Sequence, residues 1–203
     1  MNLSTALRLA SWLLIGSALS LAVFAGSNAA YDITSQNELS AAWDQAHRQT
    51  AKANPALGPA DAFQLNVQRP RLAVGQPLAK ITVPSIQWHG VVLEGNDDKV
   101  LAGGPGHLVG SAYPGEPDNV VISNHNTYSM QFANLKAGEQ IVLDTDYGHY
   151  AYRVTGFKII SATDSSVTAH TGKAQLTFTT CYPLWQGAFA KQRYVISADL
   201  VTQ

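Results

Sequence analysis

From residue 78 onward, apolar and polar side chains alternate in short runs, a pattern typical of β-strands rather than helices. Turn-forming residues separate these runs, for example Gly95-Asn96 and Pro114-Gly115. Seven runs have the length and composition of strands: residues 79–83, 90–94, 119–123, 140–144, 150–160, 174–181 and 193–201. Short strands at this spacing, without long helices between them, favour a closed antiparallel barrel or a sandwich.

Helical spacing of apolar residues precedes the strands. A capping box begins at Ser35, and an apolar stripe follows it at intervals of three and four residues. We therefore predict a helix over residues 35–53, which Asn54-Pro55 ends because the residue before a proline disfavours the helical conformation. A second, short helix is predicted over residues 97–102.

Residues 9–25 form an uncharged apolar run of 17 residues, at the short end of the roughly 17–25 that a membrane-spanning helix needs. Arg8 precedes the run and no Lys or Arg follows until Arg48, which predicts a cytoplasmic N-terminus. A retained anchor is favoured because the run exceeds the core of a signal peptide, about 7–15 residues. Cleavage is the alternative, since residues 27–29 are small. Either interpretation exports residues 31–203.

The chain therefore divides into three predicted segments. Residues 1–30 are a membrane anchor or signal segment, residues 31–77 are a helical stalk and linker, and residues 78–203 are a β-rich domain. The part predicted to be exported is long enough for one domain with a sizeable core.

Composition excludes several classes of protein. Hydrophobic residues make up 46% of the 203 residues, which excludes disorder caused by a lack of apolar side chains. The net charge of −1 gives no electrostatic footprint for nucleic acid. A single cysteine excludes an intramolecular disulfide and any metal site built from several thiolates. No cofactor is predicted.

The single cysteine, Cys181, lies at the end of a predicted strand. Alternation places Thr177, Thr179 and Cys181 on one face and the apolar Leu176 and Phe178 on the other. The apolar side chains should face the core, so the thiol should face a more polar side. Most free cysteines are small buried hydrophobes, and packing alone is the competing interpretation. An idle thiol is nevertheless a liability in an exported protein, which keeps a functional role open.

A cysteine nucleophile needs a base and a group that stabilises the oxyanion. Of six histidines, His125 is distinguished because it directly follows an apolar strand, whereas His107 follows a glycine-rich loop and is a weaker candidate. An ordinary surface histidine is the alternative. Arg193 opens the last predicted strand, and a hairpin after Cys181 would bring its guanidinium beside the thiol; a salt bridge at the rim is the alternative.

Together these residues resemble a known family. The segment from Thr177 to Cys181, Thr-Phe-Thr-Thr-Cys, resembles the Thr-Leu-x-Thr-Cys signature of sortases, the cysteine transpeptidases that anchor surface proteins. Residues 119–125 resemble the histidine strand of that family, and residues 193–198 resemble its arginine strand. The order His, Cys, Arg matches, and so do the approximate separations between these residues along the chain. The resemblance covers about residues 78–201.

Two departures bear on the subclass. Asn126 follows the histidine where many Gram-positive members have arginine. The Cys181-Tyr182-Pro183 continuation and the N-terminal anchor look more like the Gram-negative (class GN) sortases. No acidic cluster resembles the calcium site of some relatives, so no metal is expected.

The resemblance implies an all-β fold, a closed eight-stranded barrel with short helices, in which residues 78–203 form the catalytic domain. It implies that Cys181 is the nucleophile, His125 the acid and base, and Arg193 the oxyanion-stabilising group. Thr179, Thr180 and Asn124 are expected to contact substrate.

It further implies that the chain cleaves the C-terminal sorting signal of an exported protein through a thioacyl intermediate and transfers it to an amine at the envelope. The expected location is the inner membrane, with a single span and the catalytic domain on the periplasmic or extracytoplasmic side. A hydrolytic cysteine peptidase and a non-enzymatic, anchored peptide-binding barrel are the alternatives.

Overall fold

The computed structural model describes residues 11–20, 35–47, 71–126, 129–186 and 190–201. The chain divides into two compact units, Met1–Ser35 and Gln36–Gln203. In the first unit residues 11–20 form a helix, and the rest of the predicted anchor lies outside the described residues. None of the helices that are described combines the length and the apolar character required for crossing a membrane.

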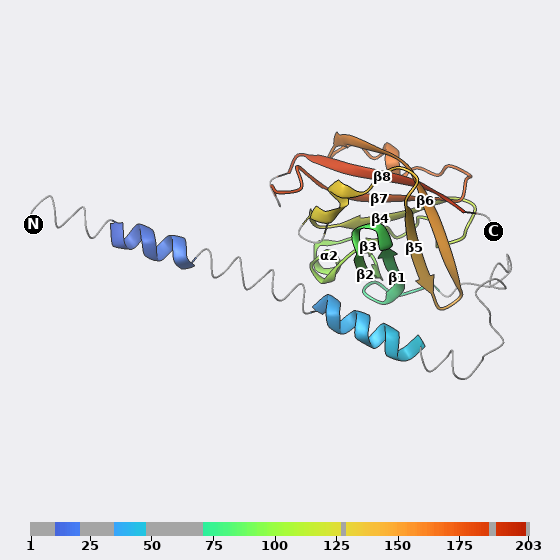
Figure 1. Cartoon of the computed structure of the whole chain (residues 1–203), viewed down its shortest axis with the longest axis horizontal. Coiled ribbons are helices and arrows are strands. Elements are labelled where there is room, and N and C mark those ends of the chain that lie inside the picture. The colour runs from blue at the N-terminus through green and yellow to red at the C-terminus, as the bar shows by residue number, and fades with distance from the viewer. Residues whose placement is uncertain (1–10, 21–34, 48–70, 127–128, 187–189, 202–203) are drawn as a thin grey trace, which may run out of the picture. The chain divides into compact units, whose positions relative to one another are not determined.

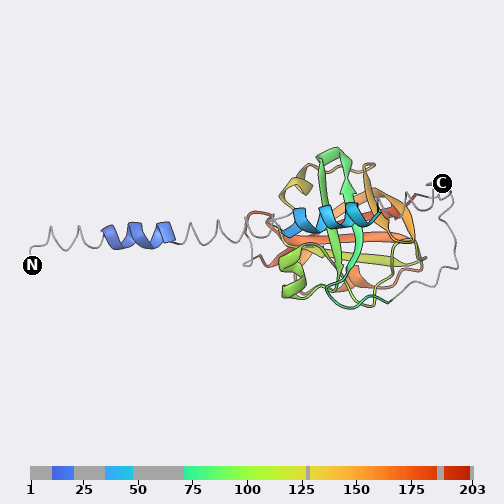
Figure 2. The ribbon, with the colours of Figure 1, turned by 90° about the horizontal axis from the view of Figure 1, so that it is seen from below.

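The described strands of the second unit close into a barrel, seen from two directions in Figure 1 and Figure 2. The strands are β1 (Pro77–Val83), β2 (Trp88–Glu94), β3 (Gly106–His107), β4 (Asn119–Asn124), β5 (Gln140–Thr145), β6 (Gly148–Ser161), β7 (Gln175–Tyr182) and β8 (Gln192–Leu200). All seven predicted strands are present, with ends that differ by at most two residues. The additional strand is β3, which is too short to show alternation in a sequence.

Short helices join the strands. The predicted helix at 97–102 is confirmed as α2 (Asp98–Gly103), and Asp97 caps it by accepting a hydrogen bond from the Val100 amide at 2.9 Å. Among the described residues, the 3-10 helices η1 (Pro84–Ile86), η3 (Met130–Asn134) and η4 (Ser166–Thr168) are not predicted by the sequence pattern. Residues 35–47 are helical as predicted, while residues 48–53 lie outside the described part of the chain.

The strand order around the barrel is β1-β2-β3-β4-β7-β8-β6-β5, and β5 pairs with β1 to close it. The prediction of a closed barrel is confirmed, but the prediction that it is antiparallel throughout is wrong at two places. The pairs β2–β3 and β4–β7 are parallel. Parallel strands need a long connection, and the segment between β4 and β7, which includes β5 and β6, supplies one.

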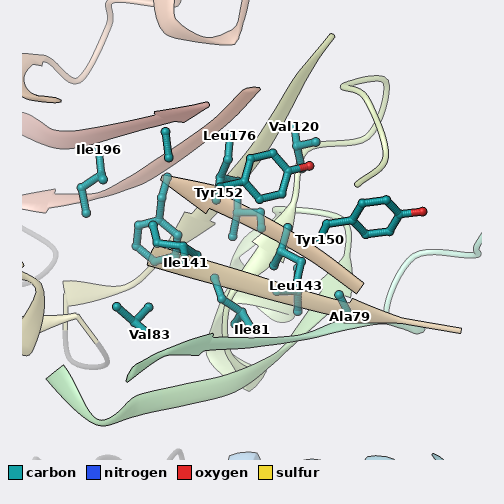
Figure 3. Packing of buried hydrophobic residues seen from close by; sticks show 14 of the residues in the cluster. Ala79, Ile81, Val83, Val120, Ile141, Leu143, Tyr150, Tyr152, Leu176 and Ile196 are labelled. Atoms are coloured by element: carbon teal, nitrogen blue, oxygen red, sulfur yellow. The ribbon is translucent and has the colours of Figure 1, made fainter. Parts of the chain in front are cut away.

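The core fills the inside of the barrel (Figure 3). Side chains from several strands converge there, among them Ile81, Tyr152 and Ile196, which are fully buried. Aromatic rings fill one part of this interior: Phe132 stacks on Phe178 with ring centroids 4.6 Å apart. Leu176 and Phe178 face the core, which confirms the alternation predicted for β7.

The helix at residues 35–47 packs on the outer side of β2. Trp43 is buried against Val91, Leu93 and Val100 in a second, smaller apolar cluster. The side chain of Gln36 accepts from the Val91 amide at 2.8 Å and donates to the Gly103 carbonyl. The apolar stripe of this helix is therefore the face that packs on the outside of the barrel.

Candidate active site

Cys181 lies one residue before the end of β7 and is half-buried. Its neighbours on the inner face, Thr180 and Tyr182, alternate with it, so the thiol is on the outer side of the barrel wall. Its strand partner is Arg193, because β7 and β8 form an antiparallel pair in which these two residues are opposite each other. Paired residues of neighbouring strands project to the same face of a sheet. The structure therefore brings the thiol and the guanidinium together on one face, as the hairpin hypothesis requires.

His125 immediately follows β4, which pairs with β7 on the edge opposite to β8. The parallel β4–β7 pair ends with Asn124 opposite Thr180, so the next position along both strands holds His125 and Cys181. Because parallel strands run in one direction, both residues emerge at the same end of the barrel. His125, Cys181 and Arg193 thus occupy one level of three adjacent strands.

Hydrogen bonds fix the segments that carry the histidine and the cysteine. The buried hydroxyl of Ser129 donates to the His125 carbonyl at 2.8 Å. The buried side-chain amide of Asn126 donates to the Leu184 carbonyl at 2.6 Å, which joins the segment after His125 to the loop after Cys181. Asn126 therefore restrains the distance between the two strand ends from which the imidazole and the thiol project.

The Arg193 side chain is oriented by main-chain oxygens. Its Nη1 donates to the carbonyls of Ala190 at 3.4 Å and Gln192 at 3.1 Å. Carbonyl oxygens are neutral acceptors, so this guanidinium is positioned without being paired to a carboxylate by these bonds. A positioned cation is one of the groups that can stabilise a developing oxyanion.

A pocket of about 210 Å³ lies beside Arg193. Thr179 and Arg193 line it from the barrel wall, and the β6–β7 connection supplies the opposite wall with Ala162, Asp164, Val167 and others. The Ser166 hydroxyl and amide donate to Asp164 and hold the pKa of that carboxyl below its usual range. The pocket therefore offers one cation and one anion on an otherwise uncharged lining of aliphatic and hydroxyl side chains.

The predicted substrate contacts lie on two different faces. Thr179 is on the outer face, where its hydroxyl donates to Ser123 at 3.1 Å, and it lines the pocket. Thr180 and Asn124 are opposite each other on the inner face, each almost completely buried. Within the described residues, the Thr180 hydroxyl and the Asn124 carbonyl oxygen have no hydrogen-bond partner. That these three residues contact substrate stays a prediction.

The remaining histidines lie elsewhere. His107 is fully buried, with Nδ1 2.9 Å from Glu94 and Nε2 2.9 Å from the Ala112 carbonyl. A carbonyl only accepts, so Nε2 of His107 is committed as a donor and is not available as a base. We expect His47 to be solvated, because it lies on the predicted stalk helix. Its ring instead stacks on Trp43 with ring centroids 4.1 Å apart, and its Nε2 lies 2.8 Å from Oδ1 of Asp146.

Other groups of titratable side chains do not form a metal centre in the part of the chain that the structure describes. No three His, Cys, Asp or Glu side chains are grouped there in a way that could hold a metal ion. A larger pocket beside titratable groups, about 600 Å³, is lined by Trp43, Lys80, His149 and neighbours, and includes none of the three candidate residues.

Sequence reasoning about function misses two polar residues. It identifies Asn126 only as a departure from the family pattern, whereas the bond of Asn126 to Leu184 crosses 58 residues of sequence. It gives Asp118 no role, although the Asp118 carboxylate accepts from several groups of the β6–β7 connection. Asn126 bonds to a main-chain carbonyl and Asp118 accepts from several main-chain amides, and main-chain partners leave no residue-type signal. The Pro117-Asp118-Asn119 sequence before a predicted strand is the available hint, because Asp and Asn are typical residues for turns that bond to the backbone.

A cysteine at a strand end, with a histidine and an arginine on the two adjacent strands, defines the class of β-barrel proteins with a cysteine nucleophile. The family described as Sortase domain matches residues 81–201. The match spans more than half of the chain, and the protein belongs to the sortase family.

Known relatives agree with this assignment. The chain is 34% identical to sortase D of Bacillus subtilis over 130 residues, which is 63% of this chain and 66% of that relative, just under two thirds of its length. The sortase D5 transpeptidase of Clostridium perfringens superposes with a TM-score of 0.59 at 24% identity, over 76% of this chain and 95% of that one. Sortase C of the same organism, solved with the C-terminal cell wall sorting motif, has a TM-score of 0.59 at 22% identity, over 74% of this chain and 81% of that one. At these identities the two solved structures show a shared fold.

Proposed function

We propose that this chain is a cysteine transpeptidase that cleaves the C-terminal sorting signal of an exported protein and transfers the new carboxyl end to an amine. The observation that carries the proposal is the position of Cys181 between His125 and Arg193 on adjacent strands, with Arg193 lining a pocket. Membership of the sortase family supports it. The sorting motif that accompanies sortase C of Clostridium perfringens supports a C-terminal peptide as the substrate class.

The proposed reaction has two acyl-transfer steps. The Cys181 thiolate forms a bond to the scissile carbonyl carbon, the C–N bond breaks, and the His125 imidazolium gives its proton to the leaving amine. The neutral His125 then takes a proton from the incoming amine, whose nitrogen forms the new amide bond as the C–S bond breaks. Arg193 stabilises the oxyanion in both tetrahedral intermediates. Thiolate and imidazolium are restored at the end.

The test is a mass-spectrometric assay on the purified full chain. The probes are peptides with a Leu-Pro-Xaa-Thr-Gly core, incubated with and without triglycine. We expect an acyl adduct on Cys181 and a ligated product that requires triglycine, and neither from Cys181→Ala. Cleavage that yields only the free acid at high triglycine would make the chain a hydrolase. A peptide that binds without cleavage or adduct would make it a peptide-binding barrel.

The proposal includes a single-span anchor over residues 9–25, with the barrel on the extracytoplasmic side of the cytoplasmic membrane. The uncharged run and the charge of Arg8 support it. Fractionation of cells with an alkaline carbonate wash should leave the chain in the membrane pellet, and protease added outside the cytoplasmic membrane should digest the barrel. Recovery of a shortened chain in the soluble extracytoplasmic fraction would show that the segment is cleaved.

Assignment to the Gram-negative class is also a proposal. Asn126 and the Cys181-Tyr182-Pro183 sequence support it, whereas the curated relative described above is from Bacillus subtilis. Ligation to the amine of a Gram-negative peptidoglycan stem, compared with the amine of a pentaglycine branch, would distinguish the two assignments.

A further inference from the structure

The β6–β7 connection forms one wall of the pocket, and most of its side chains are exposed to solvent. Residues 162–166 and 168–173 are exposed, and Val167 is half-buried. An exposed connection of this length loses conformational entropy when it is held in one conformation, and apolar contacts here do not offset that cost. The conformation of this wall must therefore depend on polar contacts with the barrel.

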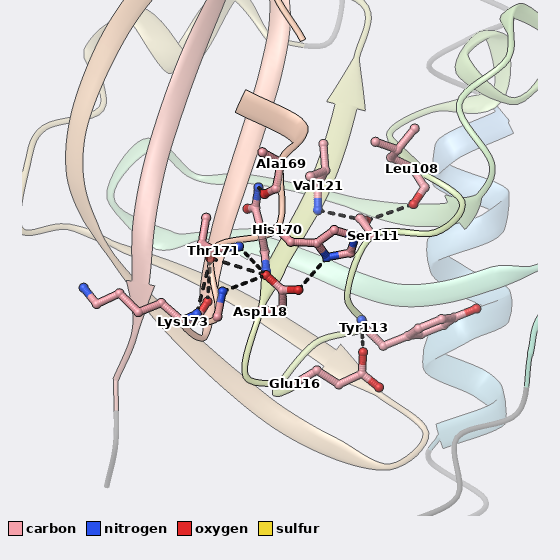
Figure 4. A network of polar contacts seen from close by, with 12 residues as sticks. Leu108, Ser111, Tyr113, Glu116, Asp118, Val121, Ala169, His170, Thr171 and Lys173 are labelled. Atoms are coloured by element: carbon pink, nitrogen blue, oxygen red, sulfur yellow. Dashed lines mark hydrogen bonds and ion pairs between the residues drawn. The ribbon is translucent and has the colours of Figure 1, made fainter. Parts of the chain in front are cut away.

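Asp118 supplies the first set of these contacts (Figure 4). Its Oδ1 accepts from the amides of Thr171 at 2.6 Å and Gly172 at 3.2 Å, and also from the Asn119 amide at 2.8 Å. Its Oδ2 is 2.6 Å from Nδ1 of His170. A single carboxylate thus fixes the end of the connection that leads into β7.

Asn119 supplies the second set. Its side-chain amide donates to the carbonyls of Val167 at 3.0 Å and Ala169 at 3.2 Å, which hold the η4 turn. Its side-chain oxygen accepts from the Thr177 hydroxyl at 2.8 Å. Asn119 is buried, so these bonds are shielded from competition with water. We call Asp118, Asn119 and their bonds to residues 167–172 the loop clasp.

The loop clasp is remote from the reacting atoms. Asp118 precedes β4, whereas His125 follows it, and seven residues of extended chain span about 23 Å. Neither clasp residue lines the pocket, but Val167 and Thr168, which the clasp holds, do. Asp118 can therefore affect the reaction only by changing where the pocket wall lies.

We propose that Asp118 and Asn119 are positioning residues for the substrate, because they hold the β6–β7 connection against the barrel as the outer wall of the peptide-binding pocket. This inference rests on the proposed function. The carboxylate is suited to the role because the backbone amide of Thr171, above all, together with His170 and the Asn119 amide, holds the pKa of Asp118 far below its usual range. The anionic acceptor is therefore present at neutral and mildly acidic pH.

The experiment compares the full wild-type chain with Asp118→Ala, Asp118→Asn and Glu139→Gln. Glu139 is the matched control, because it also accepts from a main-chain amide and a hydroxyl, those of Lys136 and Ser85, but does not line the pocket. Two quantities are measured: hydrogen exchange of residues 161–173, and the steady-state constants with the Leu-Pro-Xaa-Thr-Gly peptides. Alkylation of Cys181 by iodoacetamide reports whether the thiol site itself is intact.

For Asp118→Ala we expect faster exchange at residues 161–173 and a KM raised about tenfold or more, with kcat and the alkylation rate within about twofold of the wild type. Asp118→Asn keeps a neutral acceptor for the Thr171 and Gly172 amides. Its exchange rate and its KM should therefore lie between those of the wild type and those of Asp118→Ala. Glu139→Gln should change none of these quantities. A general loss of structure would instead lower kcat and protection throughout the barrel.

Unchanged exchange at residues 161–173 in Asp118→Ala overturns the loop clasp, whatever the peptides show. Faster exchange with an unchanged KM also overturns the inference, because the wall would then not determine substrate affinity. If the wild-type chain turns over none of the peptides, the proposed function fails, and the exchange data still decide whether Asp118 holds the connection.

Discussion

Arg193 and Asn126 illustrate how single side chains define the site. Both bond to main-chain carbonyls after β7: Asn126 to Leu184 in the β7–β8 connection, and Arg193 to Ala190 in that connection and to Gln192, the first residue of β8. Carbonyl oxygens are fixed by the backbone, so these two side chains are oriented by the fold. The positions of the groups around Cys181 therefore depend on the guanidinium of Arg193 and the side-chain amide of Asn126, each of which carries several N–H donors in a fixed plane.

We expect Arg193→Lys to lower kcat/KM by about two orders of magnitude or more with little change in the melting temperature. Lysine keeps the charge, but its three donors radiate from one nitrogen and do not reproduce the planar fork of the guanidinium, so it cannot keep the same carbonyl bonds and face an oxyanion in the same geometry. The measurement is peptide cleavage by the purified variant, with the melting temperature as a check on folding. Near-normal turnover would remove Arg193 from the catalytic residues.

Asn126→Ala should lower turnover about tenfold or more, because it releases the segment after His125 from the loop after Cys181 and leaves the Leu184 carbonyl without its donor. Asn134→Ala, an exposed asparagine in η3, is the matched control. Steady-state cleavage by both variants is compared at equal alkylation of Cys181. Equal activity of the two variants would show that Asn126 does not position the pair.

Much of the site can be predicted at the residue scale. Alternation along β7 predicts that Cys181 projects from the face of the strand that does not carry the apolar Leu176 and Phe178. The hairpin spacing predicts that Arg193 lies beside Cys181. Asn126 is different, because its role depends on a carbonyl 58 residues away that belongs to no sequence motif. Backbone acceptors are identical at every position, so the sequence does not show which of them a side chain reaches.

Two segments outside the barrel strands are held in place by a few contacts each. The β6–β7 connection is held by the loop clasp, and the helix at residues 35–47 is held to β2 by Trp43 and Gln36. In both cases an exposed segment is fixed by a few contacts with a rigid wall. Removing one such contact should release the segment and leave the barrel folded.

The contribution of Asp118 to stability should depend on pH in a defined direction. Its pKa is lowered in the folded state, so the stabilisation is fully present above the unfolded aspartate pKa of about 3.9 and is lost as the pH falls through the folded value. Asp118→Asn should therefore have a lower melting temperature than the wild type at pH 7 and pH 5, and the difference should shrink below about pH 3. A difference that grows towards low pH would contradict the assignment.

Trp43→Ala should raise hydrogen exchange at residues 35–47 while protection of the barrel strands is retained. The substitution removes a buried indole that contacts Val91, Leu93 and Val100, a loss of about 3 kcal/mol for a well-packed aromatic side chain. Trp185→Ala is the control, because that indole is 77% exposed. Loss of protection throughout the barrel would mean that the helix is part of the same cooperative unit.

For the molecule as a whole, the pattern of strands predicts a closed barrel but not its pairing. Residues 79–83 and 193–201 can be recognised as strands from alternation alone, whereas the two-residue β3 cannot. The direction of pairing is decided by which strands become neighbours after long connections, and alternation is the same in parallel and antiparallel strands. The wrong expectation at β4–β7 follows from this.

That parallel pair has a kinetic consequence. His125 and Cys181 are distant in sequence, with β5 and β6 between them, and become neighbours only when β4 and β7 align. Because this pairing joins residues distant in sequence, we expect it to form later than a local hairpin such as β7–β8. We therefore expect His125, Cys181 and Arg193 to come together only late in folding, when β4 aligns with β7.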